Sequence, residues 1–359
     1  MTSSLRLHSR ISDMLSVFLP DLYKRRHENL AWMMTGIQQA QHVHLSKIAT
    51  HRPGEATLES KTMQLRRFLA NDAIEPLTYY EPLARTLIET AARHMKRLRL
   101  LVDIVELSGH RQILMVALAY RRRALPLLWY LRRGQGATDA QTQCQLMQAI
   151  EPLLPEGKRP MIVADGEFHA VDLLAHLDEV GWGFRFRLPS STCVHLPDGT
   201  IKALSEVEIA PGERRYLQDV YLTTLHAYGP ISLAIYWKQG EDTPWFIVTD
   251  EDEASYLTLR QYSRRMLIEQ LFGDLEGGGF HLDQSQIYDL ERLSRLVLVL
   301  ALVYTWLVHV GSWVIKRGWR NRVDRRDRRD RSLVEIGRYW IRRRLTNEET
   351  LKTGLIPYF

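Results

Sequence analysis

The sequence predicts a mixed α/β protein in which an all-α region precedes a core built on a β-sheet. Residues 5–95 carry apolar side chains at helical spacing. From Arg97 onward the pattern changes to short apolar runs, and two of these runs end in aspartate. Residues 256–280 return to helical spacing and end in three glycines. We therefore expect helices first, then a sheet, and then a further helix that belongs to the sheet-based core.

Two short helices around a turn are predicted within the N-terminal region. The turn is Arg52-Pro53-Gly54, and the polar faces of the helices beside it carry Lys47, Arg66 and Arg67. A helix pair of this kind can bind DNA, because Arg and Lys on its exposed face contact phosphates and base edges. A helical bundle with solvated basic residues explains the same pattern equally well. Both interpretations stay open on these residues alone.

Two of the strands predicted between residues 97 and 183 end in a carboxylate. Asp103 follows the apolar run 98–102, and Asp165 follows the run 160–164 after a spacing of 62 residues. A single aspartate at the end of a strand is usually a turn former or a helix cap. Asp250 also ends an apolar run and is the rival for the second position. The strands predicted over 112–120 and 124–129 complete a meander, and the second of them is expected at an edge because Pro126 lacks an N–H donor.

The helix predicted over 256–280 has one apolar face and one polar face. Its polar face carries Tyr262, Arg265, Glu269 and Glu276, which lie within about 60° of one another on a wheel of about 100° per residue. A solvated surface explains such a face when the helix is taken alone. Two buried strands that end in Asp, followed 104 residues later by a helix with Glu269, are what a ribonuclease-H-like fold needs to bring three carboxylates together. Oxygen ligands of this kind suit Mg²⁺.

The spacing of Tyr262, Arg265 and Glu269 resembles the Tyr-Arg-Glu-Lys signature of the DDE transposases of bacterial insertion sequences, in the IS-four family. Arg123-Ala124-Leu125-Pro126 and Asp165-Gly166-Glu167-Phe168 are similar to two further motifs of that family. Two positions depart from the pattern: Glu276 stands where the family has its final Lys, and Gly166 stands where it has Arg.

The resemblance implies a cut-and-paste transposase that cleaves and transfers DNA strands with the help of two Mg²⁺ or Mn²⁺ ions. Its catalytic and metal-binding residues would be Asp103, Asp165 and Glu269. The resemblance also implies that Tyr262 and Arg265 contact the phosphate near the cleaved strand. The other expected DNA contacts follow from basic residues in two predicted regions: Lys47, Arg66 and Arg67 on the helix pair, and Arg185 and Arg187 in the β-rich insertion. The expected partners are the terminal inverted repeats and the target as double-stranded DNA, with a dimer in the synaptic complex. A domesticated or degenerate transposase that binds DNA without cutting is the alternative, and Glu276 and Gly166 favour it.

Composition is compatible with this expectation. Forty-eight Lys and Arg against 42 Asp and Glu give a net charge of +6, which suits a polyanionic partner. Two cysteines form neither a disulfide framework nor a cysteine-rich zinc site, so a reducing cytoplasm is the expected compartment. The resemblance implies that this cytoplasm is bacterial and that the protein is associated with the nucleoid. The apolar run 296–310 is shorter than the roughly 20 residues that span a bilayer, so we expect a buried core helix and no membrane.

The segment 316–331 contains nine Lys or Arg among sixteen residues. It is either a solvated segment whose charges pair with one another or a tail that follows phosphates, and both interpretations stay open. We expect five parts in the chain: a helical DNA-binding domain over 1–95, the first part of the ribonuclease-H-like core over 96–183, a β-rich insertion over 184–250, the second part of the core over 251–315, and a basic helical tail over 316–359.

Overall fold

Helices come first in the computed structural model, which describes residues 2–359 of the chain. The hydroxyls of Thr2 and Thr57 accept hydrogen bonds from backbone N–H groups in the first turns of α1 and α4, which fixes where these helices begin. The predicted helix pair around residue 52 is present as α3 and α4. The N-terminal helices are α1 (Ser3–Phe18), α2 (Lys24–Ala40), α3 (Leu45–Ala49), α4 (Leu58–Leu69) and α5 (Pro76–His94).

A ten-stranded sheet forms the centre of the described part of the chain, with the strand order β3-β2-β1-β4-β5-β10-β9-β8-β6-β7. Strands β1, β2 and β3 are an antiparallel meander, whereas β4 lies parallel to β1 and β5 lies parallel to β4. The strands are β1 (Arg99–Leu107), β2 (Arg111–Tyr120), β3 (Arg123–Arg133), β4 (Met161–Ala164), β5 (Gly183–Arg187), β6 (Cys193–His195), β7 (Ile201–Ala203), β8 (Arg214–Leu222), β9 (Tyr228–Tyr236) and β10 (Trp245–Thr249).

The sheet continues without a break into the region expected as a β-rich insertion. Strand β10 pairs antiparallel with β5 on one side and with β9 on the other. The boundary expected at residue 184 falls inside β5, so it divides a strand of the common sheet. The division of the chain into domains stays a prediction. The first two helices among the strands are α6 (Ala140–Ile150) and α7 (Val171–Glu179), and 3₁₀ turns lie at Glu151–Leu153, Gly166–Phe168 and Leu204–Glu206.

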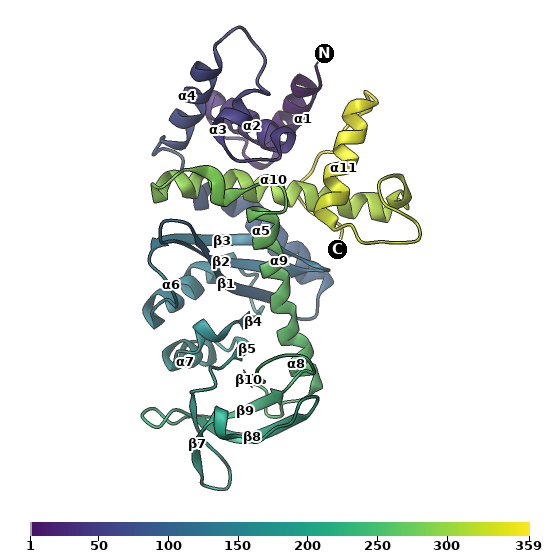
Figure 1. Cartoon of the computed structure of the whole chain (residues 1–359). Coiled ribbons are helices and arrows are strands. Elements are labelled where there is room, and N and C mark those ends of the chain that lie inside the picture. The colour runs from purple at the N-terminus through teal and green to yellow at the C-terminus, as the bar shows by residue number, and fades with distance from the viewer. Residues whose placement is uncertain (1) are drawn as a thin grey trace.

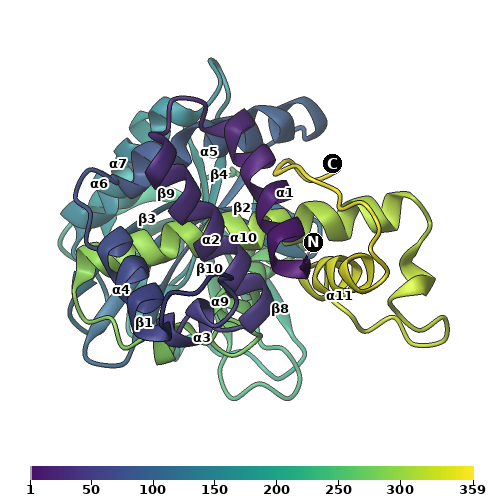
Figure 2. The same cartoon turned by 90° about the horizontal axis from the view of Figure 1, so that it is seen from above.

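The apolar run 296–310 lies inside α10 (Leu290–Lys316) and is a buried core helix, as predicted. By length and composition this helix could cross a membrane, but most of it is buried inside the protein. It lies between the N-terminal helices and the sheet, and it contacts α2, α4, α5 and β3 (Figure 1). Viewed from above, the N-terminal helices cover α10, while α11 (Leu333–Thr346) lies to one side near its C-terminal end (Figure 2).

Gly311 does not interrupt α10, because the helix continues through it to Lys316. The glycine instead allows a close crossing with α11. A Cβ atom at Gly311 would lie 2.0 Å from the carbonyl oxygen of Leu333, and one at Gly337 would lie 2.1 Å from that of Leu307. Both distances are far below a normal contact. The two helix backbones therefore touch where neither has a side chain.

The predicted helix over 256–280 is divided into two. Helix α8 (Tyr256–Tyr262) leads into a 3₁₀ turn over Ser263–Arg265, and α9 (Met266–Glu276) follows. The expectation that the glycines end the helix is right, but the residue with a positive φ is Gly279, at 120°, and not Gly277, at −111°. Further 3₁₀ turns lie at Leu282–Ser285 and Arg320–Arg322.

Candidate active site

The pairing of β1 with β4 brings Asp103 and Asp165 to the same place in the sheet. The last pair in the register of these parallel strands is Val102 with Ala164, and the next residue on each strand is an aspartate. Strand β4 ends there, whereas β1 continues to Leu107 because it still pairs with β2. The expectation that Asp103 ends its strand is therefore wrong, although the position beside Asp165 follows from the register.

Arg265 lies at the centre of the three predicted catalytic carboxylates. Its Nη1 atom is 3.2 Å from Oδ2 of Asp103 and 3.2 Å from Oδ2 of Asp165. Its Nη2 atom forms an ion pair with Oε1 of Glu269, one helical turn further on. The side chains of Arg265 and Asp103 are each only 12% exposed. The structure thus gathers Asp103, Asp165 and Glu269 around one guanidinium group.

Tyr262 supports the same group from below the surface. Its ring is 3% exposed and packs edge-on against Trp245, with 5.3 Å between the ring centroids. Its hydroxyl donates a hydrogen bond of 3.3 Å to Oδ1 of Asp165. The sequence gives no signal for Trp245, because it lies on β10 and its place is set by sheet pairing. Tyr262 is thus a buried neighbour of the carboxylates, and its expected contact with DNA stays a prediction.

The charges in this group influence one another strongly. Burial raises the pKa of Asp103 to about 7, although Arg265 and the N–H of Ile104 oppose that rise. Burial alone would lower the pKa of Arg265, but Tyr262 and the three carboxylates outweigh burial and raise it. Asp165 accepts a hydrogen bond of 2.7 Å from the N–H of Gly166. The site therefore keeps several negative groups close together by placing a permanent cation among them.

The oxygen atoms of these side chains are the ligand type that Mg²⁺ and Mn²⁺ prefer. Within residues 2–359, no three His, Cys, Asp or Glu side chains lie close enough together to share one metal ion. The guanidinium of Arg265 contacts all three carboxylates and places a positive charge beside them. The carboxylate oxygens of Asp103, Asp165 and Glu269 are suited to a divalent ion, and such an ion would bind where the guanidinium of Arg265 now lies.

Residues 106–306 match the family model described as the transposase DDE domain. The match covers more than half of the chain. The chain belongs to this transposase family. Two of the three carboxylates, Asp165 and Glu269, lie inside the matched range, and Asp103 lies three residues before it.

Two further comparisons complete the picture of this family member. No curated protein matches its sequence. Among solved structures, it is similar to the cryo-EM structure of a piggyBac transposase synaptic complex with hairpin DNA. That similarity has 12% sequence identity and a TM-score of 0.45, and it covers 98% of this chain and 83% of the other.

Asp250, the rival carboxylate in this transposase chain, lies at the other end of β5. It accepts a hydrogen bond of 2.9 Å from the N–H of Phe184, at the start of that strand. Ala164, which precedes Asp165, pairs instead with Phe186 near the end of β5. The length of the strand therefore separates Asp250 from the carboxylates around Arg265. This placement agrees with its exclusion from the predicted set.

Arg185 does not fit its predicted role as a DNA contact. Its side chain is 0% exposed, and it forms ion pairs with Asp250 and Glu251. It also donates a hydrogen bond of 2.7 Å to Oε1 of Gln261 on α8. A guanidinium that is buried and bonded on several sides has no face left for a phosphate. Arg185 ties β5 to α8 in this structure.

Arg187 occupies a more suitable place for a DNA contact. It lines a hollow of about 290 Å³ together with Asp165 and Thr243, and it donates a hydrogen bond of 3.3 Å to the hydroxyl of Thr243. Its side chain is partly exposed. A cation here lies beside one of the three carboxylates and open to solvent.

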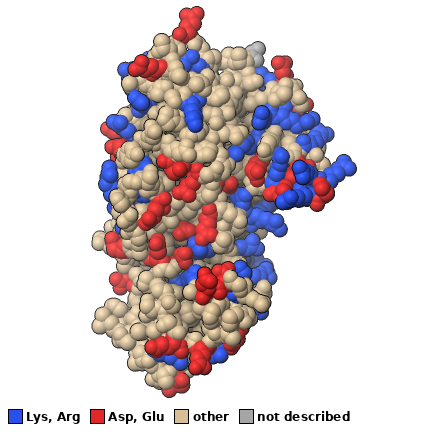
Figure 3. Space-filling view, viewed as in Figure 1, with Lys and Arg blue, Asp and Glu red and all other residues tan. Residues whose placement is uncertain are grey.

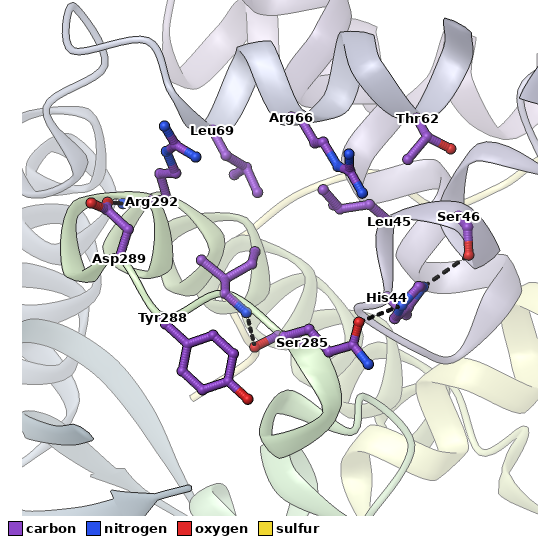
Figure 4. Close-up of a pocket in the computed structure, with 12 residues that line it drawn as sticks. His44, Leu45, Ser46, Thr62, Arg66, Leu69, Ser285, Tyr288, Asp289 and Arg292 are labelled. Carbon is purple, nitrogen blue, oxygen red and sulfur yellow. Dashed lines mark hydrogen bonds between the residues drawn. The ribbon is translucent and has the colours of Figure 1, made fainter. Parts of the chain in front are cut away.

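The basic residues predicted on the helix pair are all exposed. Lys47 lies on α3, and Arg66 and Arg67 lie on α4. Arg66 lines a hollow of about 350 Å³ between these helices and the start of α10, and Arg292 on α10 lines the same hollow (Figure 4). His44 bridges the two sides of this hollow through hydrogen bonds to Ser46 (2.8 Å) and Gln286 (3.3 Å). The three residues are placed where a DNA backbone can reach them.

Proposed function

We propose that this member of the transposase DDE domain family is a cut-and-paste transposase of a bacterial insertion sequence, of the IS-four family, with a ribonuclease-H-like core. The observation that carries the proposal is the convergence of Asp103, Asp165 and Glu269 on Arg265. These carboxylates come from two neighbouring parallel strands and one helix, far apart in sequence. The strand order 3-2-1-4-5, with a meander followed by two parallel strands, supports a ribonuclease-H-like core.

Asp103, Asp165 and Glu269 would hold two Mg²⁺ or Mn²⁺ ions in the active enzyme. Bound divalent ions supply positive charge that activates the attacking oxygen and stabilises the leaving oxygen in an in-line displacement at phosphorus. Tyr262 orients Asp165 through its hydroxyl. Arg265, which contacts all three carboxylates, would donate to the phosphate beside the cleaved bond, since a guanidinium can bind a phosphate through two hydrogen bonds.

The partners that fit this proposal are double-stranded DNA at the terminal inverted repeats and at the target. Lys47, Arg66, Arg67 and Arg187 are exposed or partly exposed and supply positive charge for phosphate contacts. Two DNA ends that are joined in one complex require a dimer there, and the bacterial cytoplasm is the compartment where such DNA lies.

A cleavage assay tests the proposal directly. Labelled DNA from the ends of the element is incubated with the protein and Mg²⁺ or Mn²⁺, and strand breaks are read on a denaturing gel. Asp165→Asn and Glu269→Gln should abolish cleavage and keep DNA binding, because binding depends mainly on phosphate contacts elsewhere. Asp250→Asn is the control and should still cleave. Cleavage that survives Asp165→Asn and disappears in a folded Asp250→Asn protein would overturn the assignment.

A degenerate transposase that binds DNA without cutting is the second candidate. Glu276 favours it, since this residue places a carboxylate where the signature has Lys, and within residues 2–359 it forms no ion pair that would offset its charge. Burial and the neighbouring Asp283 raise the pKa of Glu276. Binding of terminal DNA without cleavage in either metal would identify this candidate.

A further inference from the structure

The positive charge of the protein is concentrated in one segment near its C-terminus. Residues 316–347 contain 13 Lys and Arg against four Asp and Glu, whereas the rest of the chain contains 35 against 38. The net charge of +6 therefore comes entirely from this segment, and the remainder is slightly acidic. In the space-filling view, Lys and Arg side chains gather beside α11 and continue along the same flank below it (Figure 3).

Five arginines of this segment surround one hollow, which we call the arginine hollow. It has a volume of about 630 Å³ and lies between the loop that follows α10 and one side of α11. None of the five forms an ion pair with a carboxylate in the described part of the chain, and the one acidic side chain in the wall, Asp324, is 0% exposed and bound to Arg320. The five are Arg322, Arg325, Arg331, Arg342 and Arg343.

Aromatic side chains hold this loop in a defined shape. The guanidinium of Arg331 lies 3.7 Å from the ring centre of Tyr339 and donates a hydrogen bond of 2.7 Å to the carbonyl oxygen of Val323. Arg322 lies over Trp319, which stacks on Trp340. Contacts with rings and carbonyl groups fix the arginines without neutralising them. Some charges of the segment 316–331 do pair with one another, namely Arg320 with Asp324 and Arg328 with Asp330. The interpretation of a segment whose charges are paired internally therefore explains only these residues.

A series of contacts connects the arginine hollow to the carboxylates. Arg264, the neighbour of Arg265, donates a hydrogen bond of 3.4 Å to the carbonyl oxygen of Arg121. Arg121 donates one of 2.8 Å to the carbonyl oxygen of Tyr358. Lys316, at the end of α10, lies 4.8 Å from the ring centre of Tyr358. The exposed cations Arg264, Arg121 and Lys316 thus lead from the candidate active site to the loop.

We propose that the arginine hollow binds the phosphodiester backbone of duplex DNA, without regard to base sequence, as that DNA extends away from the carboxylates. The proposal rests on the proposed function and extends it. It adds a DNA-binding surface that lies outside the residues predicted from the sequence, and it names the phosphodiester backbone as the part of DNA that this surface binds. Guanidinium groups that form no ion pair suit the oxygens of phosphates, and contacts with Trp319 and Tyr339 hold two of them, Arg322 and Arg331, in place. Base recognition would instead need side chains that enter a groove. The arginine hollow thus increases the affinity for duplex DNA and does not distinguish one base sequence from another.

The test measures the salt dependence of binding to a fluorescein-labelled random duplex of about 30 base pairs, since each phosphate contact contributes about 0.9 to the slope of log K against log salt. In Arg325→Gln/Arg342→Gln/Arg343→Gln we expect the slope to fall by about 2 to 3 and the affinity in low salt to fall roughly tenfold or more. The same three positions changed to Lys should keep the slope, because the charges remain. Arg10→Gln/Arg93→Gln/Lys158→Gln removes three exposed cations elsewhere and is the matched control.

An unchanged slope in the triple-Gln variant, or an equal loss in the control variant, overturns the proposal. A cleavage assay at saturating protein separates this outcome from failure of the proposed function. The control variant Arg10→Gln/Arg93→Gln/Lys158→Gln should cleave as the wild type does, whereas Glu269→Gln should not. If the wild type cleaves nothing, the proposed function fails, and the salt slopes still decide whether the arginine hollow binds DNA.

Discussion

Removing Arg265 should destabilise the protein in a way that divalent ions repair. Arg265→Gln takes away the only cation that contacts all three of Asp103, Asp165 and Glu269 in the described residues. Breaking a buried ion pair costs about 3–5 kcal/mol, but Asp165 and Glu269 are 33% and 37% exposed, so water screens them. We therefore expect a loss of about 2–3 kcal/mol in the free energy of unfolding with a chelator present.

Mg²⁺ should restore part of this stability because it takes the place of the guanidinium. With 10 mM Mg²⁺ and a dissociation constant of about 1 mM, the gain is about 1.4 kcal/mol. The gain should be smaller in the wild type, in which Arg265 competes with the ion. The measurement is urea unfolding at pH 8, with and without Mg²⁺, so that Asp103 is ionised.

Arg123→Gln is the matched control for this experiment. Arg123 is 13% exposed and forms an ion pair of 3.3 Å with Asp274, away from the three carboxylates. Its loss should also destabilise the protein, but Mg²⁺ should not repair it, because a single carboxylate remains. The reasoning is refuted if Arg265→Gln unfolds like the wild type, or if Mg²⁺ stabilises both variants equally.

Three further outcomes can be checked. Glu276→Lys should tighten binding to terminal DNA by about 1 kcal/mol at low salt and make this binding depend more steeply on salt. The protein should lose no stability, because the new lysine lies near Asp283. Weaker binding of the variant across a salt series would contradict this prediction. Burial lowers the pKa of His309 from 6.5 to about 4, so acid should remove about 3 kcal/mol of stability between those pH values, and His309→Gln should unfold with a flatter pH profile. Gly337→Ala should cost about 1–3 kcal/mol in thermal unfolding because its Cβ meets the Leu307 carbonyl, whereas Gly273→Ala on α9, where the Cβ meets open space, should cost nothing.

The sequence predicts the strands and the buried helix α10, because these depend on local spacing. The grouping of Asp103 with Asp165 depends on the pairing of β1 with β4, and it is expected only because a ribonuclease-H-like fold needs it. The sequence cannot place Asp103 inside β1, since the length of that strand is set by its antiparallel partner β2. The order of the sheet beyond β5 depends on long-range pairing, so the continuity of β5 with β10 is also invisible in the sequence.

In the candidate site, too, some features can be predicted from local spacing and others depend on long-range packing. The spacing of Tyr262, Arg265 and Glu269 indicates that they belong together, but a regular helix would leave Tyr262 on an exposed face. The 3₁₀ turn over Ser263–Arg265 and the packing of Trp245 bury it instead. The sequence around Arg185 suits an exposed DNA contact and a buried ion pair equally, and the positions of Asp250 and Glu251 decide for the buried ion pair.

The position of α10 has a consequence for the order in which the chain folds. The helices of residues 3–94 emerge first during synthesis, yet three of them, α2, α4 and α5, pack on a helix that begins at residue 290. Arg295 is 3% exposed and donates hydrogen bonds to the carbonyl oxygens of Leu69 (3.1 Å) and Ile74 (3.0 Å). A nascent chain that stops short of α10 leaves the apolar undersides of its first helices in water and exposed to chaperones and proteases. Completion of the chain thus closes the N-terminal region, and we expect chains that end before α10 to be degraded faster than the complete protein.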